Sequence, residues 1–192
     1  MLTPDEMTEY ILCRDNFEYF CNNYLTLDNG SKFIFNKTQK GLVKVWDENN
    51  KTDSTTERQE GSTTLMAAYA LHHSIFNPYK CTAFVGWKLA PIEHELNIVK
   101  NFYEQLPIFI KPKLVKNNKK SLEFENNSEI FVCSANNCNV MRGRAFSLTL
   151  VSQLGFFKKD CDFITGMYPI VASGYGKYIA VTSYDTPQKG WN

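Results

Sequence analysis

The chain has 192 residues and a mass of 22.1 kDa, and 43% of its residues are hydrophobic, which is enough for one domain that buries about 70% of its unfolded surface. Its 21 Lys and Arg against 20 Asp and Glu leave a formal charge of +1, so nucleic-acid binding would need a local patch. The apolar runs are too short for a membrane-spanning helix, which excludes that class and a membrane partner. Six cysteines without a C-x-x-C pair, and an N-terminus without a signal-peptide profile, predict a reduced cytoplasmic protein.

The first fifty residues are predicted to be mainly helical. The capping-box sequence TPDE at the N-terminus predicts a helix over about residues 4–12. Aromatic residues at i, i+3 and i+7 from Phe17 predict a second short helix with one face that packs on the rest of the protein. A third helix is expected over about residues 38–47.

The composition changes between Asp47 and Thr64, where DENNKTDSTTERQEGSTT has no aliphatic side chain and predicts a loop. The sequence TTLMAAYALHH then predicts a helix, and CTAFVG at residues 81–86 predicts a short apolar strand. Another helix is expected from Ala90 to about Leu106, because Pro107 cannot continue it.

The rest of the chain predicts mainly strands. SLEFENNSEIFVCS predicts a hairpin that turns at Asn126-Asn127, and residues 147–151 and 177–182 predict two more strands. Strands interleaved with helices of ten to fifteen residues favour a layered α/β fold.

A loop of small and polar residues, ERQEGSTT at 57–64, leads directly into a helix, a context in which backbone N–H groups can hold phosphate. An ordered series of further motifs extends from it along the chain: Arg58-Gln59-x-Gly61-x-Thr63-Thr64, Leu106-Pro107, Leu122-Glu123-Phe124 with Asn127, Arg142-Gly143, Phe146, Ser152-Gln153, Thr182 and Pro187. This series resembles the N-terminal ATPase domain of the large terminase subunit, which packages double-stranded DNA into tailed bacteriophage heads.

The resemblance implies a P-loop NTPase-like α/β fold, with a mostly parallel central sheet flanked by helices. Residues 1–192 would form one such domain, with a helical part at 1–50, a P-loop-like core at 51–192 and no nuclease domain. The implied positions are Gln39 on the adenine side, Arg58, Gln59, Gly61, Ser62, Thr63 and Thr64 in the nucleotide loop, Ser152-Gln153 at the end of the Walker B strand, and Thr182, Ser183 and Thr186 in the coupling motif.

The residues at the catalytic positions depart from the family pattern. Ser62 stands where a lysine should neutralise the β- and γ-phosphates. Ser152 and Gln153 stand where two carboxylates should hold Mg²⁺ and orient the attacking water. Glu57 and Glu60 add negative charge beside the phosphate position. We therefore expect no hydrolysis by this mechanism.

These departures predict a catalytically degenerate terminase-like domain that is a binding, regulatory or structural module in phage DNA packaging. We expect no cofactor, with only weak binding of Mg·ATP left open through Thr63 and Arg58. The expected partners are phage packaging or capsid proteins, such as terminase or portal components. Double-stranded DNA is the second expected partner. The expected location is the host cytoplasm, with association with the virion left open.

Two other functions remain open. One is an active packaging ATPase with unusual catalytic residues or with a lysine and an acid from a partner. The other is a DNA-binding module that uses the basic segment, in which the candidate contacts are Lys111, Lys113, Lys116, Lys119 and Lys120. No metal site is expected, because the three histidines are not at ligand spacing with any Cys or acid, and Cys133 and Cys138 are too isolated for a four-ligand zinc site.

Overall fold

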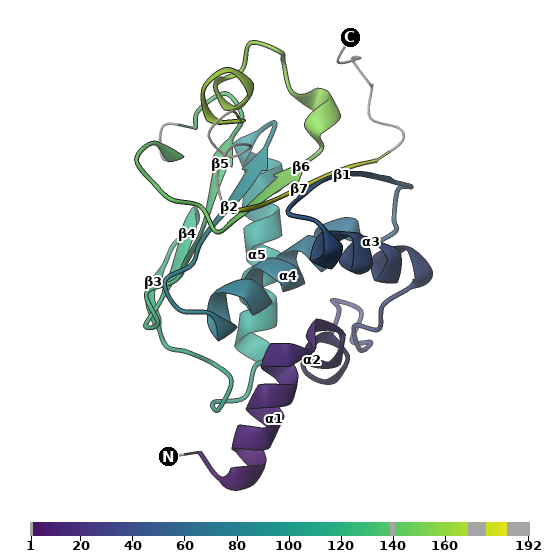
Figure 1. Cartoon of the computed structure of the whole chain (residues 1–192), viewed down its shortest axis with the longest axis vertical. Helices are drawn as coiled ribbons and strands as arrows, with labels where there is room; N and C mark the ends of the chain where they lie inside the picture. Colours follow the sequence, from purple (N-terminus) through teal and green to yellow (C-terminus); the bar gives the residue numbers. More distant parts are fainter. Residues whose placement is uncertain (1, 139–140, 169–175, 184–192) are drawn as a thin grey trace.

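The computed structural model describes residues 2–138, 141–168 and 176–183, and it contains a seven-stranded sheet with helices packed against it (Figure 1). The helices are α1 (Pro4–Asp15), α2 (Phe17–Tyr24), α3 (Lys37–Glu48), α4 (Ser62–Phe76) and α5 (Leu89–Gln105), with the short turns η2 (Leu154–Phe156) and η3 (Phe163–Met167). The strands are β1 (Lys51–Thr56), β2 (Cys81–Gly86), β3 (Leu114–Asn117), β4 (Ser121–Phe124), β5 (Glu129–Ser134), β6 (Leu148–Ser152) and β7 (Lys177–Ser183).

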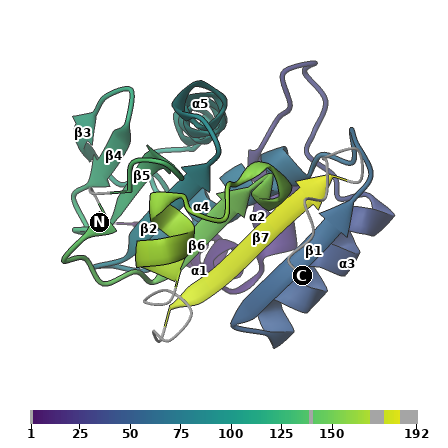
Figure 2. The ribbon, with the colours of Figure 1, turned by 90° about the horizontal axis from the view of Figure 1, so that it is seen from above.

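The strand order is β1-β7-β6-β2-β5-β4-β3. The first five strands in this order, β1, β7, β6, β2 and β5, are parallel to one another. Strand β4 pairs with β5 in antiparallel fashion, and β3 pairs with β4 in the same way. Figure 2 shows β7 and β1 side by side, with α3 next to β1. The predicted α/β class with a mostly parallel sheet is confirmed, and so is the hairpin, in which Asn127 has a φ of 62°.

The prediction of a loop from Asp47 to Thr64 is wrong for residues 51–56, which form strand β1. Every residue of this strand is in parallel register with β7, from Lys51 opposite Tyr178 to Thr56 opposite Ser183. Among the described residues β1 pairs on one side only, and an edge strand tolerates polar side chains that a central strand would not. A strand without aliphatic residues therefore forms through backbone pairing and β-branched threonines.

The strands β2 and β5 pack apolar residues against both faces of the sheet, because successive side chains point to opposite sides. Phe84 and Ile130 belong to the larger core with the helices, whereas Val85 and Phe131 belong to a second cluster with the segment that contains Phe163. Both faces are therefore covered. Within the described part of the chain, no helix has the length and apolar character needed to cross a bilayer.

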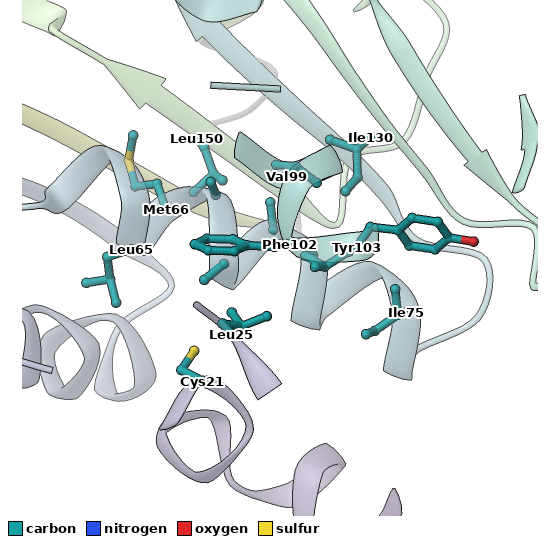
Figure 3. Packing of buried hydrophobic residues seen from close by; sticks show 14 of the residues in the cluster. Cys21, Leu25, Leu65, Met66, Ile75, Val99, Phe102, Tyr103, Ile130 and Leu150 are labelled. Atoms are coloured by element: carbon teal, nitrogen blue, oxygen red, sulfur yellow. The ribbon is translucent and has the colours of Figure 1, made fainter. Parts of the chain in front are cut away.

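The helical N-terminal part shares the larger core. Helix α1 begins with the predicted capping box at Thr3, and the docking face of α2 contributes Cys21. Figure 3 shows Cys21 and Leu25 close to side chains of α4 and α5, including Leu65 and Phe102. The carboxyl ends of β1, β6 and β7 meet at the opposite end of the sheet from this contact, which is where ligands bind in open parallel α/β sheets.

Candidate functional site

A pocket of about 510 Å³ lies at the carboxyl ends of the parallel strands. Its walls bring together residues that are far apart in the sequence, namely Glu57, Arg58, Gln59, Gly61, Ser62, Thr63, Trp87, Pro91, Gln153, Phe156 and Ser183. The loop after β1, the end of β6 and the end of β7 therefore meet as the sequence pattern implies. Of the six predicted loop residues only Thr64 is not part of the wall, since it lies further along the first turn of α4.

The loop that follows β1 ends at Gly61, which is the N-cap of α4 and has a left-handed φ of 71°. No side chain caps this helix, so the first-turn N–H groups at Ser62 and Thr63 are directed towards the pocket end of the helix. Such an N-terminus favours an anion. Among the described residues the wall contains no lysine, however, and Glu57 places a carboxylate on it.

Gln39, the predicted adenine-side residue, is buried near the N-terminus of α3. Its Nε2 donates a hydrogen bond to the Gly61 carbonyl at 3.2 Å, and its Oε1 accepts one from the Asn36 N–H at 3.0 Å. Asn36 Nδ2 in turn donates to the Glu60 carbonyl at 3.1 Å. The first turn of α3 therefore holds the backbone of the loop, and the adenine contact of Gln39 remains a prediction.

The two residues predicted at the end of the Walker B strand occupy different environments. Gln153 has a left-handed φ of 61° and lines the pocket, whereas Ser152 is buried beneath it. Ser152 Oγ donates a hydrogen bond at 2.7 Å to Oε2 of Glu95, an α5 residue that is 5% exposed. Burial raises the pKa of Glu95 to about 7, although the bond from Ser152 acts in the opposite direction.

Sequence reasoning missed Glu95. The sequence did contain a signal, because Glu95 is one turn before Val99 and one turn after Pro91, on the same helix face as the apolar residues Ile92 and Leu96. An acid inside a buried helix stripe is unusual. The same spacing explains its place in the site, since Pro91 lines the pocket and Glu95 lies one turn further along α5.

An aromatic pair that the sequence analysis did not assign closes one side of the pocket. Trp87, which follows β2, stacks on Phe156 of η2 with ring centroids 5.3 Å apart. Lys88 Nζ lies 4.2 Å from the centroid of the Trp87 ring system. This contact gives the ammonium of Lys88 an aromatic partner, and Lys88 is not part of the pocket wall.

The predicted coupling residues are placed in part. Thr182 lies in β7 opposite Thr55, and Ser183 ends β7 at the pocket wall. Thr186 lies outside the described residues. The coupling role of these residues remains a prediction.

The five candidate lysines do not form one surface. Lys111 pairs with Glu104 at 2.6 Å and lies 4.5 Å from the Tyr103 ring centroid. A separate groove of about 650 Å³ is lined by residues of the antiparallel strands β3, β4 and β5 and of the segment after β5, and it includes three of the lysines. Its lining consists of Leu89, Lys116, Asn118, Lys119, Lys120, Ser121, Glu123, Glu129, Phe131, Val132, Cys133, Ser134, Asn137 and Arg144.

Two cysteines and one histidine make contacts within the interior of the protein. Cys133 and Cys138 are buried with their Sγ atoms 3.7 Å apart. The ring of His72 packs against Phe20, and its Nε2–H donates a hydrogen bond to the Cys13 carbonyl at 2.8 Å. Throughout residues 2–138, 141–168 and 176–183, no group of three or more His, Cys, Asp or Glu side chains could hold a metal ion.

No protein-family model matches the chain. Solved structures do: the large terminase of bacteriophage HK97 has a TM-score of 0.72 at 15% identity, over 90% of this chain and 38% of that one. The large terminase ATPase domain of Thermus phage P74-26 has a TM-score of 0.54 at 12% identity, over 69% and 58%. The large terminase of the thermophilic bacteriophage D6E, in complex with ATP-γ-S, has a TM-score of 0.58 at 10% identity, over 78% and 38%.

This chain thus spans less than two thirds of the length of each of these terminase chains. At such low identity the similarity concerns the fold. The chain has the fold of the ATPase domain of phage large terminases.

Proposed function

We propose that this chain is a terminase-type domain that works in phage DNA packaging without hydrolysing ATP, as a binding, regulatory or structural module. The observation that carries the proposal is the composition of the pocket at the strand ends. A loop that ends in a left-handed glycine leads into helix α4 at this pocket, but Ser62 begins the helix and Gln153 follows β6.

The chemistry of phosphoryl transfer explains why these substitutions matter. The terminal phosphates gain charge that a lysine and Mg²⁺ normally neutralise, and a carboxylate orients the water. A serine hydroxyl at 62 is neutral, and the carboxamide of Gln153 cannot accept a proton from water as a carboxylate can. Removing one such contact typically costs roughly 10³–10⁵ in rate. The residues present therefore do not fit a hydrolysing Mg·ATP centre.

Weak nucleotide binding fits the remaining features. The N-terminus of α4 offers backbone N–H groups, and Thr63 and Arg58 are both on the pocket wall. The carboxylate of Glu57 opposes a polyphosphate at the same place. We expect an affinity for Mg·ATP well below that of a working motor.

The partners we propose are phage packaging or capsid proteins, such as terminase or portal components, in the cytoplasm of the infected host or in the virion. A domain with the fold of a motor subunit can occupy the docking position of that subunit without turning over ATP. This part of the proposal is supported by the likeness of the fold alone.

Calorimetry with Mg·ATP and with a nonhydrolysable analogue, together with a phosphate-release assay, tests the proposal. We expect no turnover and binding no tighter than the millimolar range. Micromolar binding with turnover by the native chain would overturn the proposal and favour an active packaging ATPase. Turnover that needs an added terminase or portal component would favour the version with a lysine and an acid supplied by a partner.

DNA binding is the second candidate function, and the groove beside strands β3, β4 and β5 favours it. Lys116 pairs with Glu123 at 2.6 Å, and Arg144 pairs with Glu129. Those pairs neutralise both carboxylates of the groove and leave Lys119 and Lys120 in excess. Arg144 was not predicted as a contact. A duplex of about 20 base pairs is the probe, measured by fluorescence anisotropy at several salt concentrations.

If this groove binds DNA, Lys119→Glu with Lys120→Glu lowers the affinity and reduces the slope of log K against log salt by about 2. Lys111→Glu with Lys113→Glu is the control, because it changes the net charge by the same amount at two lysines that do not line the groove. Equal effects of both changes would show that only net charge matters, and would remove the groove as a site.

A further inference from the structure

The pair formed by Ser152 and Glu95 connects the end of β6 to the middle of α5. Both side chains are buried, and the bond between Oγ and Oε2 is 2.7 Å long. The next residue, Gln153, turns into a left-handed conformation, and its N–H donates to the Val181 carbonyl at 2.8 Å. The turn that presents Gln153 to the pocket is therefore anchored on one side by Ser152 and on the other by β7.

A buried carboxyl without a cationic partner is costly, and no charged side chain compensates Glu95 among the described residues, where the Ser152 hydroxyl is the group that favours its ionised form. Helix α5 packs here against α4, β2 and β5. A costly polar group beneath a pocket is typical of a residue retained for the site rather than for stability.

We propose that Glu95 is a positioning residue of the pocket, which holds the end of β6 through Ser152 and excludes a metal-binding acid from position 152. The inference rests on the proposed function, because it concerns why the pocket does not support Mg²⁺-dependent hydrolysis. In this arrangement the carboxyl group of Glu95, on α5 beneath the strand end, is committed to a hydroxyl of the protein itself.

The physical reason is a conflict between two carboxylates. An aspartate at 152 would place its oxygens close to Glu95 Oε2, where the serine oxygen now lies at 2.7 Å. Two buried carboxylates at such a distance share one proton or repel each other. A shared proton occupies the lone pairs that a divalent cation would need. The change Ser152→Asp alone therefore cannot restore a metal-binding strand end, whereas Glu95→Gln removes the conflict and offers an amide donor to the new acid.

The test is a set of matched variants: Ser152→Asp, Ser152→Asn, Glu95→Gln and the double change Ser152→Asp with Glu95→Gln. Urea unfolding at pH 8 measures the coupling. We expect Ser152→Asp to raise the equilibrium constant for unfolding at least tenfold more than the neutral isostere Ser152→Asn does. Glu95→Gln should recover that loss, and should stabilise the Ser152→Asp chain by more than it stabilises the native chain at this pH. Glu93→Gln, two residues away on α5, removes the same charge outside this contact and should recover nothing.

A second readout is Mg²⁺-dependent binding of a nonhydrolysable ATP analogue, with Ser62→Lys and Gln153→Glu present in every protein. We expect at least tenfold tighter Mg²⁺-dependent binding for Ser152→Asp with Glu95→Gln than for Ser152→Asp with native Glu95. Equal stability of Ser152→Asp and Ser152→Asn, or equal Mg²⁺-dependent affinity with and without Glu95→Gln, would overturn the inference. If both position-152 variants fail to fold, size rather than charge is responsible, and the inference is overturned as well.

These outcomes are separable from the proposed function. Turnover by the native chain would overturn the proposed function, while the unfolding measurements would still report whether Ser152 and Glu95 are coupled. Absence of coupling in an inactive native chain would overturn only the inference.

Discussion

Gln39 Nε2 donates a hydrogen bond to the Gly61 carbonyl at 3.2 Å and thereby connects the first turn of α3 to the loop that begins α4. A Cβ added at Gly61 would lie 2.7 Å from the same nitrogen. Two features therefore favour glycine over any other residue at position 61: its left-handed backbone conformation and the Gln39 side chain beside it. Helix α3, which lies outside the parallel sheet, therefore helps to hold the pocket wall at Gly61.

This contact predicts that Gly61→Ala is unusually costly. The left-handed φ of 71° alone costs an alanine about 1–2 kcal/mol. The clash with buried Gln39 adds about 1 kcal/mol, because that carboxamide is hydrogen-bonded at both ends. Gly30→Ala is the control, since Gly30 has a φ of 81° and nothing within 4 Å of an added Cβ. Equal losses in urea unfolding would mean that Gln39 moves aside freely.

The elements that the sequence predicts well are those with strong periodicity or apolar runs. The helix after the loop and the strand at Cys81–Gly86 are predictable because most of their residues are buried and apolar, so composition alone indicates them. Strand β1 was missed because its stability comes from pairing with β7, more than a hundred residues later. Long-range pairing of a polar edge strand leaves no local signal.

The site was predictable to the same extent. The loop after β1 and the ends of β6 and β7 meet at one pocket, because parallel strands bring their carboxyl ends together. Glu95 and Trp87 belong to no motif, and their place follows only from how α5 and the end of β2 pack. Their places in the site depend on tertiary packing, which the local sequence does not indicate.

The buried Glu95 predicts a pH dependence that one substitution should remove. Its pKa is about 7 in the folded chain against an ordinary value of 4.5, so the native state keeps a proton that the unfolded chain loses. The contribution of Glu95 to the free energy of unfolding therefore falls as pH rises from 4.5 through 7, by about 3 kcal/mol in total. Glu95→Gln should be nearly neutral at pH 5 and stabilising at pH 8. A constant difference between the two proteins from pH 5 to 8 would contradict this.

His72 predicts the opposite behaviour in acid. Burial lowers its pKa to about 4 from 6.5, and its Nε2–H donates to the Cys13 carbonyl at 2.8 Å. Its stabilising contribution is complete above pH 6.5 and is lost as pH falls through 4. His72→Phe should therefore lower the free energy of unfolding by about 1 kcal/mol at pH 7.5, because one hydrogen bond is lost. The difference in stability from the native chain should shrink as the pH is lowered to 4.5. His94→Phe, on the exposed side of α5, controls for removing a histidine.

The turn of the β4–β5 hairpin caps the end of helix α4 through Asn126. A substitution at this residue should therefore lower the free energy of unfolding. Asn126 Nδ2 donates to the carbonyls of Ser74 at 2.9 Å and Ile75 at 3.2 Å, while its Oδ1 accepts from the Ser128 N–H at 3.0 Å. Asn126→Asp keeps the acceptor, loses the donor and places a negative charge at the carbonyl end of the helix.

We therefore expect Asn126→Asp to lower the free energy of unfolding by about 2 kcal/mol at neutral pH, because two carbonyls lose their donor. Asn127→Gly is the matched control, since Asn127 has a φ of 62° that glycine adopts without strain and it should change stability by less than about 0.5 kcal/mol. Guanidinium unfolding at pH 7 measures both. If the two changes were equally mild, the hairpin turn would not support α4, and the packing of that helix on the sheet would have to hold its end without a cap.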